Sequence, residues 1–89
     1  TIFDLCLRSD ELGDPLINDH HAVALGIASY EELAEIYETS ARINTLLVEL
    51  YAKAGINLVD FKIEFGRGSR GELVLADERH GLIVVCVGI

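Results

Sequence analysis

The sequence predicts a small α+β domain in which an antiparallel sheet packs against one long helix. Residues 30–54 repeat apolar side chains at helical spacings, whereas residues 57–65 and 72–77 read as strands joined by the glycine-rich link "GRGSRG". The chain has 89 residues, of which 51% are hydrophobic, enough to bury one core. We therefore expect a single domain over residues 1–89.

The long helix has clear start and stop signals. Ser29 followed by Glu32 forms a capping-box pattern, and Gly55 supplies a C-terminal stop. These signals predict a helix from Tyr30 to Ala54. Its apolar face comprises Leu33, Ile36, Tyr37, Ile43, Leu47, Leu50, Tyr51 and Ala54.

The remaining segments are shorter. Residues 2–7 read as a strand, and residues 8–15 read as a loop. Residues 16–27 are compatible with a short helix that Asn18 or Asp19 caps and Gly26 ends. Residues 82–87, "LIVVCV", fit either a buried strand or an exposed apolar segment that lacks a partner.

The first hairpin strand carries three charges on one face. Side chains alternate along a strand, so Asp60, Lys62 and Glu64 share a face, and the apolar residues between them share the other. The second strand ends on a further acid, Asp77. We expect the apolar face, formed by Val59, Phe61, Ile63, Phe65, Val74 and Ala76, to meet the helix.

Symmetric closure of the hairpin around its glycines predicts which residues oppose one another. Phe65 would lie opposite Glu72, Lys62 opposite Leu75, and Asp60 opposite Asp77. Asp77 would then join the charged face, with Leu73 and Leu75 making the same surface partly apolar. A slip of one residue would turn Asp77 away, because neighbouring residues of a strand point to opposite faces.

Two opposed carboxylates repel unless positive charge lies between them. Lys62 could supply that charge, and so could Mg²⁺, which takes hard oxygen ligands. An apolar floor edged by acids and a lysine would suit a nucleotide with its metal. The alternative is a solvated face whose charges pair across the strands. The pattern alone leaves both interpretations open.

The composition limits the kinds of molecule that we expect the chain to bind. The chain has 15 acidic and 7 basic residues, for a net charge of -8, which argues against binding to a nucleic-acid backbone. No segment reads as a signal peptide or a bilayer-spanning run, and we expect a cytoplasmic protein without a membrane partner. Cys6 and Cys86 are far apart in the sequence, and we expect two buried free thiols. The adjacent His20 and His21 suit surface or loop roles.

The motifs together resemble one enzyme family. "GINLVDFKIEFG", then a short glycine-containing loop, then "GELVLADE", resemble SAICAR synthetase (phosphoribosylaminoimidazole-succinocarboxamide synthase) of purine biosynthesis. "IFDLCLRSDELGDPLIND" is similar to the family segment in which a Phe-Asp strand leads to an Asp-Pro turn. The resemblance implies a C-terminal-side portion of the SAICAR synthetase-like, ATP-grasp-like fold, with residues 79–89 as a divergent tail.

The resemblance also implies an activity and roles for individual residues. The family joins carboxyaminoimidazole ribotide to L-aspartate with ATP and Mg²⁺, through an acyl phosphate. By resemblance, Lys62 is catalytic and binds the nucleotide, and Glu64 and Asp77 bind the nucleotide and the metal. Asp14 would bind the imidazole nucleotide substrate, and Asp60 would play a structural or supporting role.

The sequence departs from the family pattern at both ends. The family's N-terminal part is absent, and "RHGLIVVCVGI" stands where the family continues with Ser-Pro-Asp and Arg-Leu-Trp segments. We therefore expect the 89-residue chain to be inactive alone. A rival interpretation is a non-catalytic acidic module that forms homo-oligomers or binds a partner chain through the helix face and the tail segment.

Overall fold

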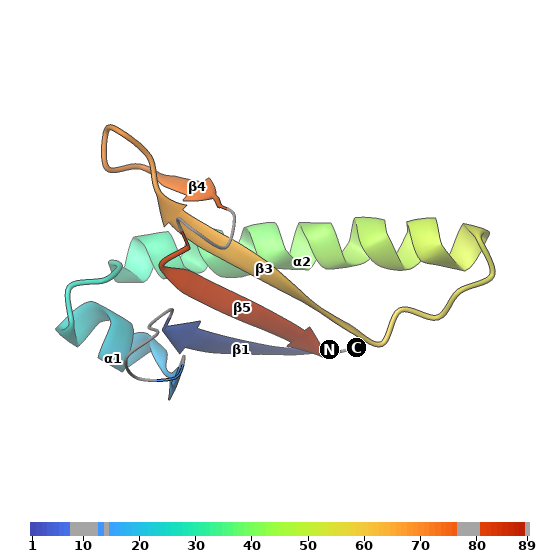
Figure 1. The fold of residues 1–89 in the computed structure, drawn as a ribbon, viewed down its shortest axis with the longest axis horizontal. Helices are drawn as coiled ribbons and strands as arrows, with labels where there is room; N and C mark the ends of the chain where they lie inside the picture. Colours follow the sequence, from blue (N-terminus) through green and yellow to red (C-terminus); the bar gives the residue numbers. More distant parts are fainter. Residues whose placement is uncertain (8–12, 14, 77–80, 89) are drawn as a thin grey trace.

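The computed structural model describes residues 1–7, 13, 15–76 and 81–88 of the chain, and they form a five-stranded antiparallel sheet with two helices (Figure 1). The sheet order is β2-β1-β5-β3-β4. The strands are β1 (Ile2–Leu7), β2 (Leu16–Ile17), β3 (Asp60–Arg67), β4 (Leu73–Leu75) and β5 (Ile83–Gly88). The helices are α1 (Asp19–Ala24) and α2 (Tyr30–Lys53). The predicted α+β class is confirmed.

Helix α2 begins and ends as its sequence predicts. The Ser29 hydroxyl accepts a hydrogen bond from the Glu32 N–H at 3.1 Å, and the Glu32 carboxylate accepts one from the Ser29 N–H at 3.0 Å. Ala54 is the C-cap, and Gly55 follows with a φ of 75°. The short helix α1 is confirmed over Asp19–Ala24 with Asn18 as its cap, whereas Leu16 and Ile17, the first residues of the segment predicted to contain it, form strand β2.

The core lies between the N-terminal half of α2 and one face of the sheet. Leu33 and Ile36 of α2 are buried with Leu5, Ile63 and Val85 of the three central strands. The C-terminal half of α2 extends beyond the end of the sheet (Figure 1). Only the first half of the predicted apolar helix face therefore packs against the sheet.

The hairpin pairing differs from the symmetric closure. Strand β3 continues through Gly66 and Arg67, so Phe65 lies opposite Leu75 and Arg67 opposite Leu73. The prediction that Leu75 opposes Lys62 and Glu72 opposes Phe65 is wrong. The turn is displaced because Gly71, with a φ of 84°, reverses the chain late in the link.

This shift changes the side of the sheet on which each side chain of β4 lies. Residues opposite one another share a face, so Leu73 and Leu75 lie on the Phe65 side, toward α2. Val74 lies opposite Gly66 and shares the face of Glu64. The expected apolar floor from the two leucines beside Lys62 is therefore absent, and Val74 does not meet the helix as expected.

Strand β5 occupies the centre of the sheet. It pairs antiparallel with β1 on one side and with β3 on the other, and Ile83, Val85 and Val87 are almost fully buried. The strand interpretation of "LIVVCV" is confirmed. The alternative of an apolar segment without a partner is wrong, and β5 offers no free edge for association.

Candidate functional site

The charged side chains of β3 lie on the sheet face that α2 leaves uncovered. Phe61, Ile63 and Phe65 belong to the core side, so the alternating Lys62 and Glu64 point to the opposite side. The prediction that Asp60, Lys62 and Glu64 share a face apart from the helix is confirmed. We call this surface, with the same-facing residues of β1 and β5, the open face.

Two rows of side chains cross the open face. Lys62 is directly opposite Cys86, which is directly opposite Asp4 on β1. One step along the strands, Glu64 is opposite Val84, which is opposite Cys6. The ammonium of Lys62 thus lies in a row with a thiol and a carboxylate, an arrangement that the sequence analysis missed because β5 had no predicted partner.

A shallow cavity lies over β1, β5 and β3 near the first residues of β1 and β3. Its volume is about 310 Å³, and its lining includes the predicted site residue Lys62. Two carboxylate residues, Asp4 and Asp60, also line it. A lysine between two acids can hold an anionic group or pair with a carboxylate, so the cavity is chemically suited to a polar, charged ligand.

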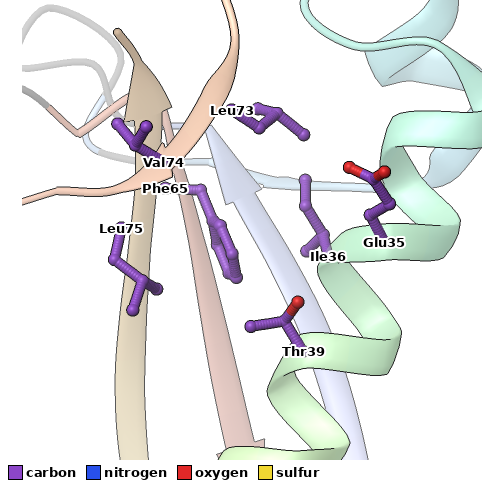
Figure 2. A pocket seen from close by; sticks show the side chains of 7 residues that line it. All are labelled: Glu35, Ile36, Thr39, Phe65, Leu73, Val74 and Leu75. Carbon is purple, nitrogen blue, oxygen red and sulfur yellow. The ribbon is translucent and has the colours of Figure 1, made fainter.

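A second cavity lies between α2 and the hairpin, on the opposite side of the sheet (Figure 2). Its volume is about 170 Å³. Phe65, Leu73 and Ile36 line its interior, and the side chains of Glu35 and Thr39 extend from α2 beside them. This cavity holds none of the predicted site residues. It reflects loose packing of the hairpin's second arm on the helix.

The predicted site residues are only partly described. Lys62 and Glu64 lie on the same face of one strand, two positions apart. Asp14 and Asp77 lie outside the described residues, so their roles stay predictions. The Ala76 N–H donates to the Glu64 carbonyl oxygen at 2.9 Å, which holds the residue before Asp77 beside β3. Asp60 lies opposite Gly88 of β5, whereas its predicted partner Asp77 lies outside the described residues.

Among residues 1–7, 13, 15–76 and 81–88, no group of three or more His, Cys, Asp or Glu side chains is placed to hold a metal ion. The predicted ligand pair is Glu64 and Asp77, and the described part of the chain contains one of the two. The Glu64 carboxylate is a hard oxygen donor of the kind that Mg²⁺ accepts.

The two cysteines differ from the expectation. Cys6 and Cys86 are free and half-buried, not fully buried, and they lie on the open face of neighbouring strands. Burial raises the pKa of the Cys6 thiol, and so do the charge and hydrogen bonding of Cys86 and the charge of Asp4. Lys62 acts in the opposite direction and lowers it.

The histidines have the local roles expected of them. The His21 ring accepts from the Asn18 N–H in the capping box of α1, and the His20 ring contacts the Tyr30 hydroxyl at 2.8 Å. Neither forms part of the open face. No helix in the described ranges is long and apolar enough to cross a bilayer.

The comparisons with known proteins match most of the chain. The family model for SAICAR synthetase matches residues 1–80. The phosphoribosylaminoimidazole-succinocarboxamide synthase of Fusobacterium nucleatum is 63% identical over 78 residues, which cover 88% of this chain and 33% of that protein. The enzyme of the same name from Dichelobacter nodosus is 62% identical over 77 residues, covering 86% of this chain and 32% of the relative.

A third relative gives the same result. The phosphoribosylaminoimidazole-succinocarboxamide synthase of Clostridium novyi is 56% identical over 78 residues, covering 88% of this chain and 33% of its own length. The chain therefore spans about one third of the length of the relatives it matches. Since the family model covers nearly the whole sequence, the chain belongs to the SAICAR synthetase family.

Proposed function

We propose that this chain is a segment of an ATP-dependent ligase of purine biosynthesis, and that its open face contributes to the nucleotide and metal site. The observation that carries the proposal is the position of Lys62 and Glu64 on a sheet face that the helix leaves uncovered, within the residues that match the family. The parent fold would be ATP-grasp-like, and the protein would act in the cytoplasm.

The reaction would join two substrates by forming a C–N bond. ATP would phosphorylate the carboxylate of carboxyaminoimidazole ribotide to an acyl phosphate, and the amine of L-aspartate would then displace phosphate. Activation is needed because a carboxylate is a poor electrophile. Mg²⁺, held by Glu64 and Asp77, would neutralise charge on the triphosphate during transfer.

The chain's own residues would position and stabilise the reacting groups. The Lys62 ammonium would contact the nucleotide or its phosphates and offset the negative charge that develops during phosphoryl transfer. Asp14 would contact the imidazole nucleotide substrate. Because the chain spans about one third of its relatives, the isolated chain would bind nucleotide weakly and would not complete the reaction.

Nucleotide binding to this chain tests the site. Isothermal titration with ATP and Mg²⁺ should give a measurable affinity that Lys62→Met and Glu64→Gln each weaken at least about tenfold, the loss of one charge-assisted contact. Lys53→Met and Glu49→Gln are matched controls, since they make the same chemical changes on exposed positions of α2. Equal losses in the controls, or no binding to the unaltered chain, would refute the site.

The exposed half of α2 favours a second candidate function, self-association. Leu46 is 66% exposed and Leu50 is 63% exposed, and they lie one helical turn apart in the C-terminal half of α2. Ile56 and Val59, in the segment that leads back to the sheet, are 53% and 69% exposed. Large exposed apolar side chains are typical of an interaction surface when they lie together.

Sedimentation equilibrium tests whether a second copy of the chain covers this surface. The unaltered chain should form a dimer that Leu46→Glu with Leu50→Glu converts to a monomer. Ala34→Glu, a matched addition of charge at an exposed position nearer the start of α2, should leave the dimer intact. A monomer at all concentrations would refute self-association and would assign the surface to contacts within a longer family chain.

A further inference from the structure

The fold brings the two cysteines, which lie at opposite ends of the sequence, onto one face of neighbouring strands. In the pairing of β1 with β5, Cys6 is opposite Val84 and Asp4 is opposite Cys86. Cys6 and Cys86 are therefore diagonal neighbours on the open face. Diagonal neighbours in an antiparallel pair have Cα atoms about 7–8 Å apart and Cβ atoms somewhat closer than that, so long side chains can meet.

That separation is slightly more than the Cα separation of about 4.4–6.8 Å usual for a disulfide, so the bond closes only with a small approach of the two strands. Strand twist and rotation of both side chains about their Cα–Cβ bonds bring the sulfur atoms of such a pair together. Cys86 also contributes to the raised pKa of the Cys6 thiol, as expected of side chains that are neighbours on one face. Both thiols are half-buried, so small molecules can reach them.

The neighbouring charges assign different roles to the two thiols. Burial and the Cys86 and Asp4 charges raise the pKa of the Cys6 thiol, which therefore stays protonated to higher pH. Cys86 is directly opposite Lys62 on one side and Asp4 on the other. A thiol that stays protonated is the poorer first nucleophile, so Cys6 is suited to the second step, in which it displaces the group that Cys86 acquires.

We propose that Cys6 and Cys86 form a redox-sensitive thiol pair that closes to an intramolecular disulfide by exchange with a small-molecule disulfide such as oxidised glutathione. The Cys86 thiolate attacks one sulfur of the small disulfide, forms a mixed disulfide and releases one thiolate. The Cys6 sulfur then loses its proton, attacks the Cys86 sulfur and releases the second thiolate. The protein loses two electrons and two protons, and the small disulfide becomes two thiols.

Only Cys6 of the pair lies in the part of the chain that matches the family. The match ends at residue 80, whereas Cys86 lies on β5, so the inference does not rest on the proposed ligase function. The disulfide would link β1 to β5 near the centre of the sheet. It would also enclose nearly the whole chain in one covalent loop, which restricts the unfolded state.

Exchange in a glutathione buffer tests the proposal. The purified chain is incubated with oxidised glutathione, alkylated to block remaining thiols, and analysed by intact mass and peptide mapping. The expected product has lost two hydrogen atoms, carries no alkyl group, and yields one linked peptide pair that contains Cys6 and Cys86. Cys6→Ser and Cys86→Ser should each give a glutathione adduct on the remaining cysteine.

A comparison with the unfolded chain separates fold-dependent pairing from chance encounter. Because the folded sheet holds the two thiols together, the intramolecular disulfide should form at least about tenfold faster in native buffer than in concentrated urea. An equal or slower native rate would overturn the proposal. Stable glutathione adducts on both cysteines, or disulfides only between chains, would overturn it as well.

Discussion

Arg67 and Glu32 form a two-pronged ion pair that joins the end of strand β3 to the first turn of helix α2. One guanidinium nitrogen, Nη2, donates to Glu32 Oε1 at 2.9 Å, and Nη1 donates to Oε2. Nη2 also donates to the Ile27 carbonyl at 2.7 Å, and Nη1 to the Gly71 carbonyl at 3.0 Å. One side chain therefore fixes the helix, the segment before it and the hairpin turn relative to one another.

This ion pair makes the stability of the fold depend on pH. The hydrogen bond from Arg67 and those from Ser29 lower the pKa of Glu32 from 4.5 to about 2. A pKa that is lower in the folded state stabilises the fold above the unfolded pKa, and the stabilisation disappears as the pH falls toward the folded pKa. The stabilisation of the folded state by the Glu32 carboxylate should therefore be complete above about pH 5, and it should be lost between about pH 4.5 and pH 2.

Glu32→Gln isolates the charge, because glutamine can still complete the capping box. We expect the substitution to lower the free energy of unfolding by about 2 kcal/mol at neutral pH, and by less than half of that near pH 3. Urea denaturation at both pH values measures the difference. Glu38→Gln is the control. Its pair with Arg42 has side chains 65% and 76% exposed, so its loss should stay below about 0.5 kcal/mol. If Glu32→Gln lowered the free energy of unfolding equally at both pH values, the effect could not be assigned to the charge of Glu32.

Tyr37 connects both helices to the first strand. Its hydroxyl donates to Asp19 Oδ1 at 2.6 Å, and its ring meets Phe3 edge-on with centroids 6.5 Å apart. Burial, followed by the hydrogen bond and charge of Asp19, raises the pKa of Tyr37 above its ordinary value. We expect Tyr37→Phe to lower the free energy of unfolding by about 1–2 kcal/mol, because it leaves the carboxylate without its donor.

A double-mutant cycle checks this contact. If the hydroxyl acts through Asp19, Tyr37→Phe should cost about 1 kcal/mol less in an Asp19→Ala background, which lacks the acceptor, than in the unaltered chain. Thermal or urea denaturation of the unaltered chain, the two single variants and the double variant gives the coupling free energy between the two side chains. Additive losses would show that the two side chains contribute independently, and the hydrogen bond would then carry none of the stability attributed to it.

The helices could be predicted from sequence because their determinants are local. Ser29 and Glu32 form the capping box within one turn, and Asn18 caps α1 through His21, three residues away. The alternation of Lys62 and Glu64 with core residues was also predictable, since strand geometry fixes it. None of these features depends on how distant segments meet.

The pairing partners could not be predicted in the same way. The glycine-rich link allows several closures, and the one observed turns Leu73 and Leu75 to the helix side of the sheet, where Leu73 packs against the core and Leu75 stays 59% exposed. The place of β5 depends on contacts with β1 and β3, which are far apart in the sequence and for which the sequence carries no local signal. The proximity of Cys6 and Cys86, and the row that includes Lys62, follow from that placement.

Gly71 tests the hairpin closure. Its φ of 84° lies in the left-handed region, and no atom lies within 4 Å of the position that a Cβ would take. Gly71→Ala should therefore lower the free energy of unfolding by about 1 kcal/mol through backbone conformation alone, without a clash. Gly71→Asn should cost less, because asparagine tolerates this conformation. Urea denaturation ranks the three proteins, and an alanine variant as stable as the unaltered chain would show that the turn adopts another conformation.

Strand β5 should be indispensable for folding, although it lies beyond the residues that match the family. Val85 is fully buried between Leu5 of β1 and Ile63 of β3. Val85→Ala removes two methyl groups from this position, which should lower the free energy of unfolding by about 2–3 kcal/mol. Val59→Ala makes the same change at a residue that is 69% exposed, and its loss should stay below about 0.5 kcal/mol.

Removal of the strand provides the stronger test of its role. A chain that ends at residue 80 leaves β1 and β3 without their shared partner and exposes the apolar side of α2, so its amide NMR spectrum should lose the dispersion of a folded sheet. Val85→Asp should have a similar effect, because it buries an unpaired charge. A well-dispersed spectrum for the shortened chain would mean that β1 and β3 find another arrangement, and that β5 is an addition to the fold rather than its centre.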